Sequence, residues 1–209
     1  MTPIGPPQVT VNKKYEFQNG ERTGGIIVSP DAVAYHVSRY RTFEDFCEML
    51  STALETVHGI VELGLVERVG LRYVDLVRPG PSESRSAYFS SGLLGLDESR
   101  LETKDSKFAA EQLGKTEAGV LAVRLYQRDD GGFLPPDLEP SPLEHQNPKL
   151  NHGEKATLLD IDHYAEFEKS AIEFSVAKIM DLFWRLHNNA DLAFAAAVTD
   201  HAREVWGTK

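Results

Sequence analysis

Asp160 and Asp162 are separated by one residue in the segment KATLLDIDHY (155–164). The alternation of apolar and polar residues in this segment is typical of a β-strand. Residues two apart on a strand point to the same side, about 6.5–7 Å apart. Two such carboxylates could hold a divalent cation or carry out acid–base chemistry, and Tyr164 continues the same face. A structural role on the polar face of a sheet is the alternative, and we favour it.

Arginines are spaced in the same way on two other segments with strand character. Arg68 and Arg72 flank Gly70, which leaves space for a ligand to approach, and Arg124 and Arg128 share a face of their own segment. If these strands neighbour the aspartate strand, opposed charges form a ladder across the sheet, at about 0.2–1 kcal/mol for each pair. Guanidinium groups also suit phosphate and carboxylate ligands. The candidate ligand-binding residues are therefore Arg68, Arg72, Arg124, Asp160, Asp162 and Tyr164.

Familiar catalytic signatures are missing from the chain. It has no nucleophile elbow, no Walker A loop and no dinucleotide-binding glycine pattern. The sequence therefore predicts no catalytic nucleophile and no cofactor. Its single cysteine, Cys47, excludes an intrachain disulfide and a thiolate zinc site, and we expect it to be buried. His187 is expected at a helix end, where a cation complements the helix dipole.

The elements that must position these side chains follow from periodicity. Alternating patterns predict strands over 9–17, 24–29, 32–40, 64–77, 119–128 and 155–164. An apolar stripe predicts a helix over 42–58 with Thr42 as its N-cap. A second helix is expected from about Glu166, with a break at Asn188-Asn189 and a final helix over 191–207. Residues 82–117 are expected to form loops with a short helix.

Segregated runs of strands and helices indicate the α+β class with an antiparallel sheet. We expect the helix over 42–58 and the C-terminal helical pair to pack on one face of that sheet. The arginine strands and the aspartate strand should present their charges on the other side. A single domain over 1–209 is expected, with a disordered N-terminal tail (1–8) and a long proline-rich loop (129–153).

Charge and composition restrict the function classes. The chain has 209 residues, with 32 acidic and 22 basic side chains and a net charge of −10. Bulk nucleic-acid binding is disfavoured, because that affinity comes from clustered cations. There is no apolar run of signal-peptide or membrane-span length, so we expect a cytoplasmic protein with no membrane contact.

Three segments together resemble a sporadically distributed bacterial family of uncharacterised proteins. They are the strand ERVGLRYVDLV, the strand LLDIDHY and the C-terminal helical pattern that runs from WRLHNNADLAF to AREVWG. Members of that family begin with a further strand and helix ahead of the region near Tyr15, so this chain would be a short or truncated variant. The resemblance implies a gene carried on mobile elements or in antiviral defence or toxin–antitoxin neighbourhoods. The resemblance implies no set of catalytic residues.

These observations favour a non-enzymatic recognition or accessory module that binds another protein. Self-association through the terminal helices is a second expectation, because both helices are rich in aromatic residues. Two alternatives stay open. One is a metal-dependent hydrolase or nuclease that uses Asp160 and Asp162, and the other is an anion or nucleotide sensor that uses Arg68, Arg72 and Arg124.

Overall fold

The chain is described by a computed structural model that covers residues 13–80, 82–96, 100–101, 107–128, 132–139, 141–145, 156–167 and 170–207. These residues divide into two compact units, where the sequence predicts one domain. The first comprises the described parts of Met1–Glu62 and Ser141–Gln146, and the second those of Leu63–Pro140 and Asn147–Lys209. The predicted tail (1–8) lies outside the described residues, as does much of the predicted loop (129–153).

The described part of the first unit is a three-stranded antiparallel meander with one helix. Its elements are β1 (Tyr15–Gln18), β2 (Gly24–Val28), β3 (Val33–Val37) and α1 (Phe43–Val61). The Thr42 side chain accepts a hydrogen bond of 3.1 Å from the Asp45 backbone N–H, as its N-cap pattern predicts. Helix α1 packs towards β3, and the rings of Phe46 and Tyr35 lie 5.0 Å apart. Cys47 is buried, which raises the pKa of its thiol to about 11.

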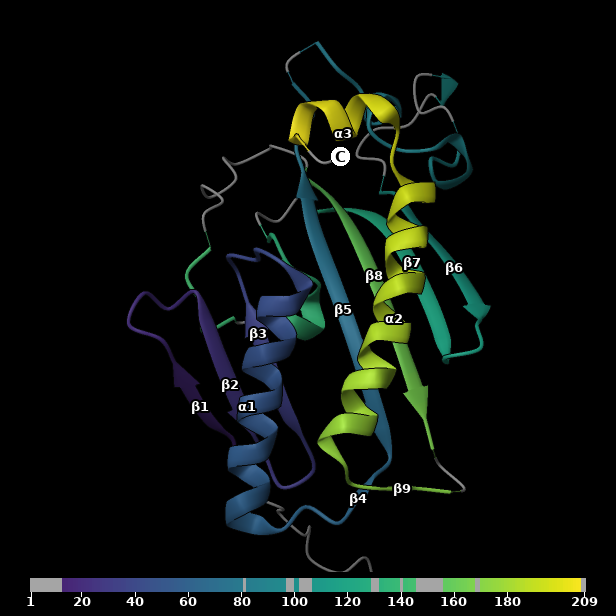
Figure 1. Ribbon diagram of the computed structural model, residues 1–209. Coiled ribbons are helices and arrows are strands. Elements are labelled where there is room, and N and C mark those ends of the chain that lie inside the picture. Colours follow the sequence, from purple (N-terminus) through teal and green to yellow (C-terminus); the bar gives the residue numbers. More distant parts are fainter. Residues whose placement is uncertain are drawn as a thin grey trace, which may run out of the picture. The chain divides into compact units, whose positions relative to one another are not determined.

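The second unit is built on a four-stranded antiparallel sheet in the order β5-β8-β7-β6 (Figure 1). Its strands are β5 (Arg68–Val77), β6 (Ala109–Lys115), β7 (Val120–Arg128) and β8 (Ala156–Glu166). A short ribbon lies beside it, in which β4 (Leu65–Val66) pairs with β9 (Ile172–Glu173). Because β8 is central, its residues have neighbours on both sides.

The described part of this unit also contains two helices and three single-turn helices. They are α2 (Val176–Ala197), α3 (Asp200–Trp206), η1 (Arg85–Ala87), η2 (Ser91–Leu93) and η4 (Pro136–Leu138). Helix α2 crosses one face of the sheet and packs against β5, β7 and β8 (Figure 1). The core beneath it includes Leu125, Leu159 and Ile161, which are almost fully buried.

Strand alternation gives this sheet one apolar and one charged face. Val69, Ile161 and Leu125 are buried on the side of α2. Arg72 and Asp160 occupy positions of the opposite parity on β5 and β8, so they share the other face. The predicted separation of charge from hydrocarbon on one sheet is therefore confirmed for these three strands.

His163, on the apolar side of β8, connects the β6–β7 hairpin to α2 by polar contacts on both of its ring nitrogens. It is fully buried; its Nδ1 lies 2.8 Å from the Leu186 carbonyl oxygen and its Nε2 lies 2.8 Å from Thr116 Oγ1. Thr116 Oγ1 also accepts a hydrogen bond of 3.0 Å from the Gly119 backbone N–H, which closes the turn. A side chain at Gly119 has no room, because its Cβ would lie 2.0 Å from the Tyr164 carbonyl oxygen.

The α+β class is confirmed, but the arrangement of elements differs from the expectation in three ways. The strands that the structure describes form three sheets rather than one. Residues 109–115 form β6, where a loop with a short helix is expected. Helix α2 begins at Val176 rather than near Glu166, because the chain first pairs β9 with β4 and Ser175 then caps the helix.

Helix α2 continues through Asn188-Asn189, so the predicted break is wrong. The Asn189 side chain donates a hydrogen bond of 3.1 Å to the Arg185 carbonyl oxygen, and Leu186 and Ala190 are buried on either side. Burial of this face outweighs the low helix propensity of asparagine. His187 consequently lies inside the helix rather than at its end, with its Nδ1 3.0 Å from the Tyr73 hydroxyl.

Candidate functional site

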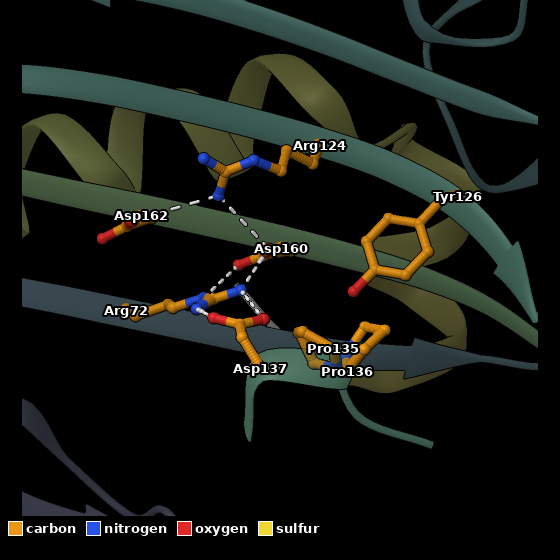
Figure 2. A pocket seen from close by; sticks show the side chains of 8 residues that line it. All are labelled: Arg72, Arg124, Tyr126, Pro135, Pro136, Asp137, Asp160 and Asp162. Atoms are coloured by element: carbon orange, nitrogen blue, oxygen red, sulfur yellow. Dashed lines mark hydrogen bonds and ion pairs between the residues drawn. The ribbon is translucent and has the colours of Figure 1, made fainter. Parts of the chain in front are cut away.

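A cleft of about 400 Å³ opens on the charged face of the second unit's sheet (Figure 2). Strands β5, β7 and β8 form its floor, and the η4 turn contributes residues to its lining. The lining residues are Arg72, Arg124, Tyr126, Pro135, Pro136, Asp137, Asp160 and Asp162. Four of the six predicted site residues therefore come together here.

Arg72 is bound by carboxylates on two sides. Its Nε and Nη2 donate hydrogen bonds of 2.7 and 2.8 Å to the two oxygens of Asp160. On the outer side, its Nη1 and Nη2 donate to the carboxylate of Asp137, at 2.5 and 3.3 Å. Burial by itself lowers the pKa of Arg72, but the hydrogen bonds to the two carboxylates outweigh it and raise that pKa. Arg72 is thus a permanently charged anchor.

Arg124 contacts three acidic side chains of this face. Its Nε donates a hydrogen bond of 2.5 Å to Glu111 of β6, and its Nη1 lies 3.4 Å from Asp160 and 3.9 Å from Asp162 (Figure 2). Strand register explains this arrangement, since Arg124 is paired directly with Asp160 and Arg72 with Asp162. The charges alternate across the floor, as the ladder hypothesis predicts.

Asp160 is the buried centre of the ladder. Only 1% of its side chain is exposed, and both of its oxygens accept hydrogen bonds from guanidinium groups. A metal ion at this position would have to displace Arg72 and to lie beside Arg124. The residues that surround Asp160 therefore make it a structural acceptor rather than a cation ligand.

Asp162 differs from its neighbour although both carboxylates lie on the same face. It accepts no hydrogen bond from the residues that the structure describes, and its nearest cation is Arg124 at 3.9 Å. Its side chain is 15% exposed at the cleft. Burial raises the pKa of Asp162, and the surrounding arginines oppose this shift without cancelling it. Asp162 is the acid of the cleft whose charge is least satisfied.

Asp137 is a site residue that the sequence analysis misses. It follows Pro135 and Pro136 in η4, and its side chain is 64% exposed although it is bound to Arg72. Hydrogen bonds from Arg72 hold the pKa of Asp137 below its ordinary value. Because it lies in a proline-rich segment 65 residues from Arg72, no local periodicity indicates this contact.

Arg68 and Tyr164 lie on the same face but do not line the cleft. The guanidinium carbon of Arg68 is 4.5 Å from the centre of the Tyr164 ring, and its Nε is 3.5 Å from Glu166. The space that Gly70 was expected to leave for a ligand is filled by this pair, since a Cβ there would meet Tyr164 at 3.4 Å. The side chain of Arg128 lies outside the described residues.

The chain matches no family model, no curated protein and no solved structure. Among the described residues, no group of three or more histidine, cysteine, aspartate or glutamate side chains is placed to hold a metal ion. In the same part of the chain, no helix combines the length and apolar character that a bilayer span requires.

Proposed function

We propose that this chain is a non-enzymatic recognition module that binds a basic segment of a partner protein in the cleft on its charged sheet face. One observation carries the proposal. Asp162 is a desolvated carboxylate that faces the cleft and accepts no hydrogen bond from the described residues. A charged group in this position gains most from a cationic donor, because charge-assisted hydrogen bonds are the stronger ones.

Charge balance supports a cationic ligand rather than an anionic one. The cleft is lined by two arginines and three aspartates, and Glu111 contacts Arg124 at its side. The guanidinium groups of Arg72 and Arg124 already donate to carboxylates. The chain as a whole carries a net charge of −10, which steers basic partners towards it.

The walls of the cleft suit a lysine or arginine side chain. Tyr126, Pro135 and Pro136 supply apolar surface at the other end from Asp162 (Figure 2). Long basic side chains bury their aliphatic stems on such surface and keep the charged head near a polar group. At about 400 Å³, the cleft is of the size that ligand pockets have.

The two alternative functions have less support. A metal-dependent hydrolase needs the carboxylates of Asp160 and Asp162 together, but Asp160 is bound by Arg72 and Arg124. An anion or nucleotide sensor needs free guanidinium edges, yet Arg68 lies on Tyr164 and Arg72 is bound by two carboxylates. The link to mobile elements or defence systems depends on the family resemblance alone, and is proposed on that basis.

Binding of short fluorescent peptides to the full chain tests the proposal. We expect oligoarginine and oligolysine peptides to bind, and Asp162→Asn to weaken their affinity about tenfold or more, because it removes the charge without changing the size. Asp181→Asn is the matched control, since Asp181 is 73% exposed on α2 and does not line this cleft. Equal losses in the two variants would mean bulk attraction, and binding of oligoglutamate instead would favour the anion sensor. Either result would overturn the proposal.

A further inference from the structure

We propose that β6 is a dimerisation edge, at which the strand pairs antiparallel with β6 of a second copy around a two-fold axis at Leu113. Strand β6 ends the sheet order β5-β8-β7-β6, and six of its seven residues are exposed. Such an edge offers unpaired backbone donors and acceptors to any matching strand. This inference is independent of the function proposed for the cleft.

The direction of the backbone groups follows from two hydrogen bonds at the ends of the hairpin. The Thr116 N–H donates to the Gly119 carbonyl oxygen at 2.8 Å, and the Gln127 N–H donates to the Phe108 carbonyl oxygen at 3.1 Å. Antiparallel strands alternate between residues that bond to one neighbour and residues that face the other way. The even-numbered residues of β6 therefore bond to β7, and the backbone groups of Ala109, Glu111, Leu113 and Lys115 face outwards.

The charged side chains among these outward residues select the register of the dimer. With Leu113 opposite Leu113, the backbone groups of Glu111, Leu113 and Lys115 are paired, and each Glu111 lies opposite the Lys115 of the other copy. Oppositely charged residues directly across a strand pair stabilise it, and here the pair occurs twice. Leu113, which is 59% exposed in the single copy, would be covered by its equivalent at the axis.

The second copy is favoured over a different partner because the edge is complementary to itself. Strand β6 has no proline, and its one acidic and one basic side chain are equidistant from Leu113. The two-fold arrangement is the commonest symmetry of homo-oligomers. Self-association was expected at the terminal helices, and the strand edge replaces them in this proposal.

Cysteine cross-linking of the full chain tests the register. In the proposed pair, the two Leu113 Cα atoms are about 5.5 Å apart, which lies within the disulfide range. Leu113→Cys should thus form a disulfide-linked dimer under mild oxidation. Ala109→Cys is the matched control on the same strand and face, because its two copies would be about 27 Å apart. If the two variants cross-link equally, the register is wrong.

Sedimentation over a range of concentrations tests the association itself. We expect the unmodified chain to form a dimer that dissociates on dilution, and Lys115→Glu to weaken it at least tenfold because Glu111 would then face a glutamate. Lys178→Glu on α2 makes the same change in net charge and should leave the dimer unchanged. A monomer at every concentration, or equal effects of the two variants, would overturn the proposal.

Discussion

The guanidinium of Arg72 holds the carboxylate of Asp160 by two hydrogen bonds of 2.7 and 2.8 Å across strands β5 and β8. The acid is 1% exposed and the arginine 22% exposed, so water screens the pair weakly. A buried pair of this kind is costly to break, because the Asp160 carboxylate would lose both short hydrogen bonds and keep only the longer contact of 3.4 Å with Arg124.

We therefore expect Arg72→Ala to lower the free energy of unfolding by about 3 kcal/mol. The double variant Arg72→Met with Asp160→Leu should recover most of that loss, since apolar residues of similar size fill the space without leaving a charge. Urea unfolding followed by circular dichroism measures both. A single variant that is as stable as the double one would mean that the pair does not hold the sheet face together.

In contrast to Arg72, we predict that neutralising Asp162 makes the folded chain more stable at neutral pH. Burial raises its pKa in the folded chain, so the stability that it contributes is complete below the pKa of the unfolded chain. That contribution is lost as the pH rises through the folded pKa. Asp162→Asn should consequently increase the free energy of unfolding at neutral pH, and the gain should disappear in acid. An equal gain at both pH values would contradict this explanation.

The pKa of Asp137 should lie below the ordinary aspartate value, and the pKa of Asp162 should lie above it. Hydrogen bonds from Arg72 lower the pKa of Asp137, whereas burial raises that of Asp162. A titration of carboxyl carbon shifts by NMR measures both in one sample. In Arg72→Met the pKa of Asp137 should return towards the ordinary value. If it stays low, Arg72 is not the cause.

The tight turn at Gly119 gives a prediction about packing alone. Its Cβ would lie 2.0 Å from a backbone oxygen of β8, which cannot move without disturbing the sheet. Gly119→Ala should lower the free energy of unfolding by about 2 kcal/mol or more. Gly114→Ala is the control in the same hairpin, because nothing lies within 4 Å of the Cβ that it adds. Thermal unfolding of the two variants should differ clearly, and similar losses would argue against the clash.

Local periodicity is sufficient to predict which side chains share the charged face. Alternation on three strands places Arg72, Arg124, Asp160 and Asp162 on one side, and the structure has them there. It does not give the strand order or register, which depend on long connections between the strands. The difference between Asp160 and Asp162 therefore appears only in three dimensions, where arginines bind Asp160 closely and no described residue donates a hydrogen bond to Asp162.

Two failures of prediction have a common cause. Residues 109–115 include alanine, glutamate, glutamine and leucine, which favour helices in isolation, yet pairing with β7 makes them a strand. Asn188-Asn189 predicts a helix break, yet the buried neighbours of these residues keep α2 continuous. In both segments, contacts with distant residues outweigh local propensity. Asp137 was missed for a related reason, since only its distant partner Arg72 makes it part of the site.

The burial of Cys47 has a practical consequence for every experiment on this chain. It is the only native thiol, and burial keeps it in the protonated, unreactive form at neutral pH. A cysteine introduced on the surface can therefore carry a fluorophore or a spin label without replacement of the natural one. Distance measurements between labelled positions can then follow how the two compact units are arranged in solution.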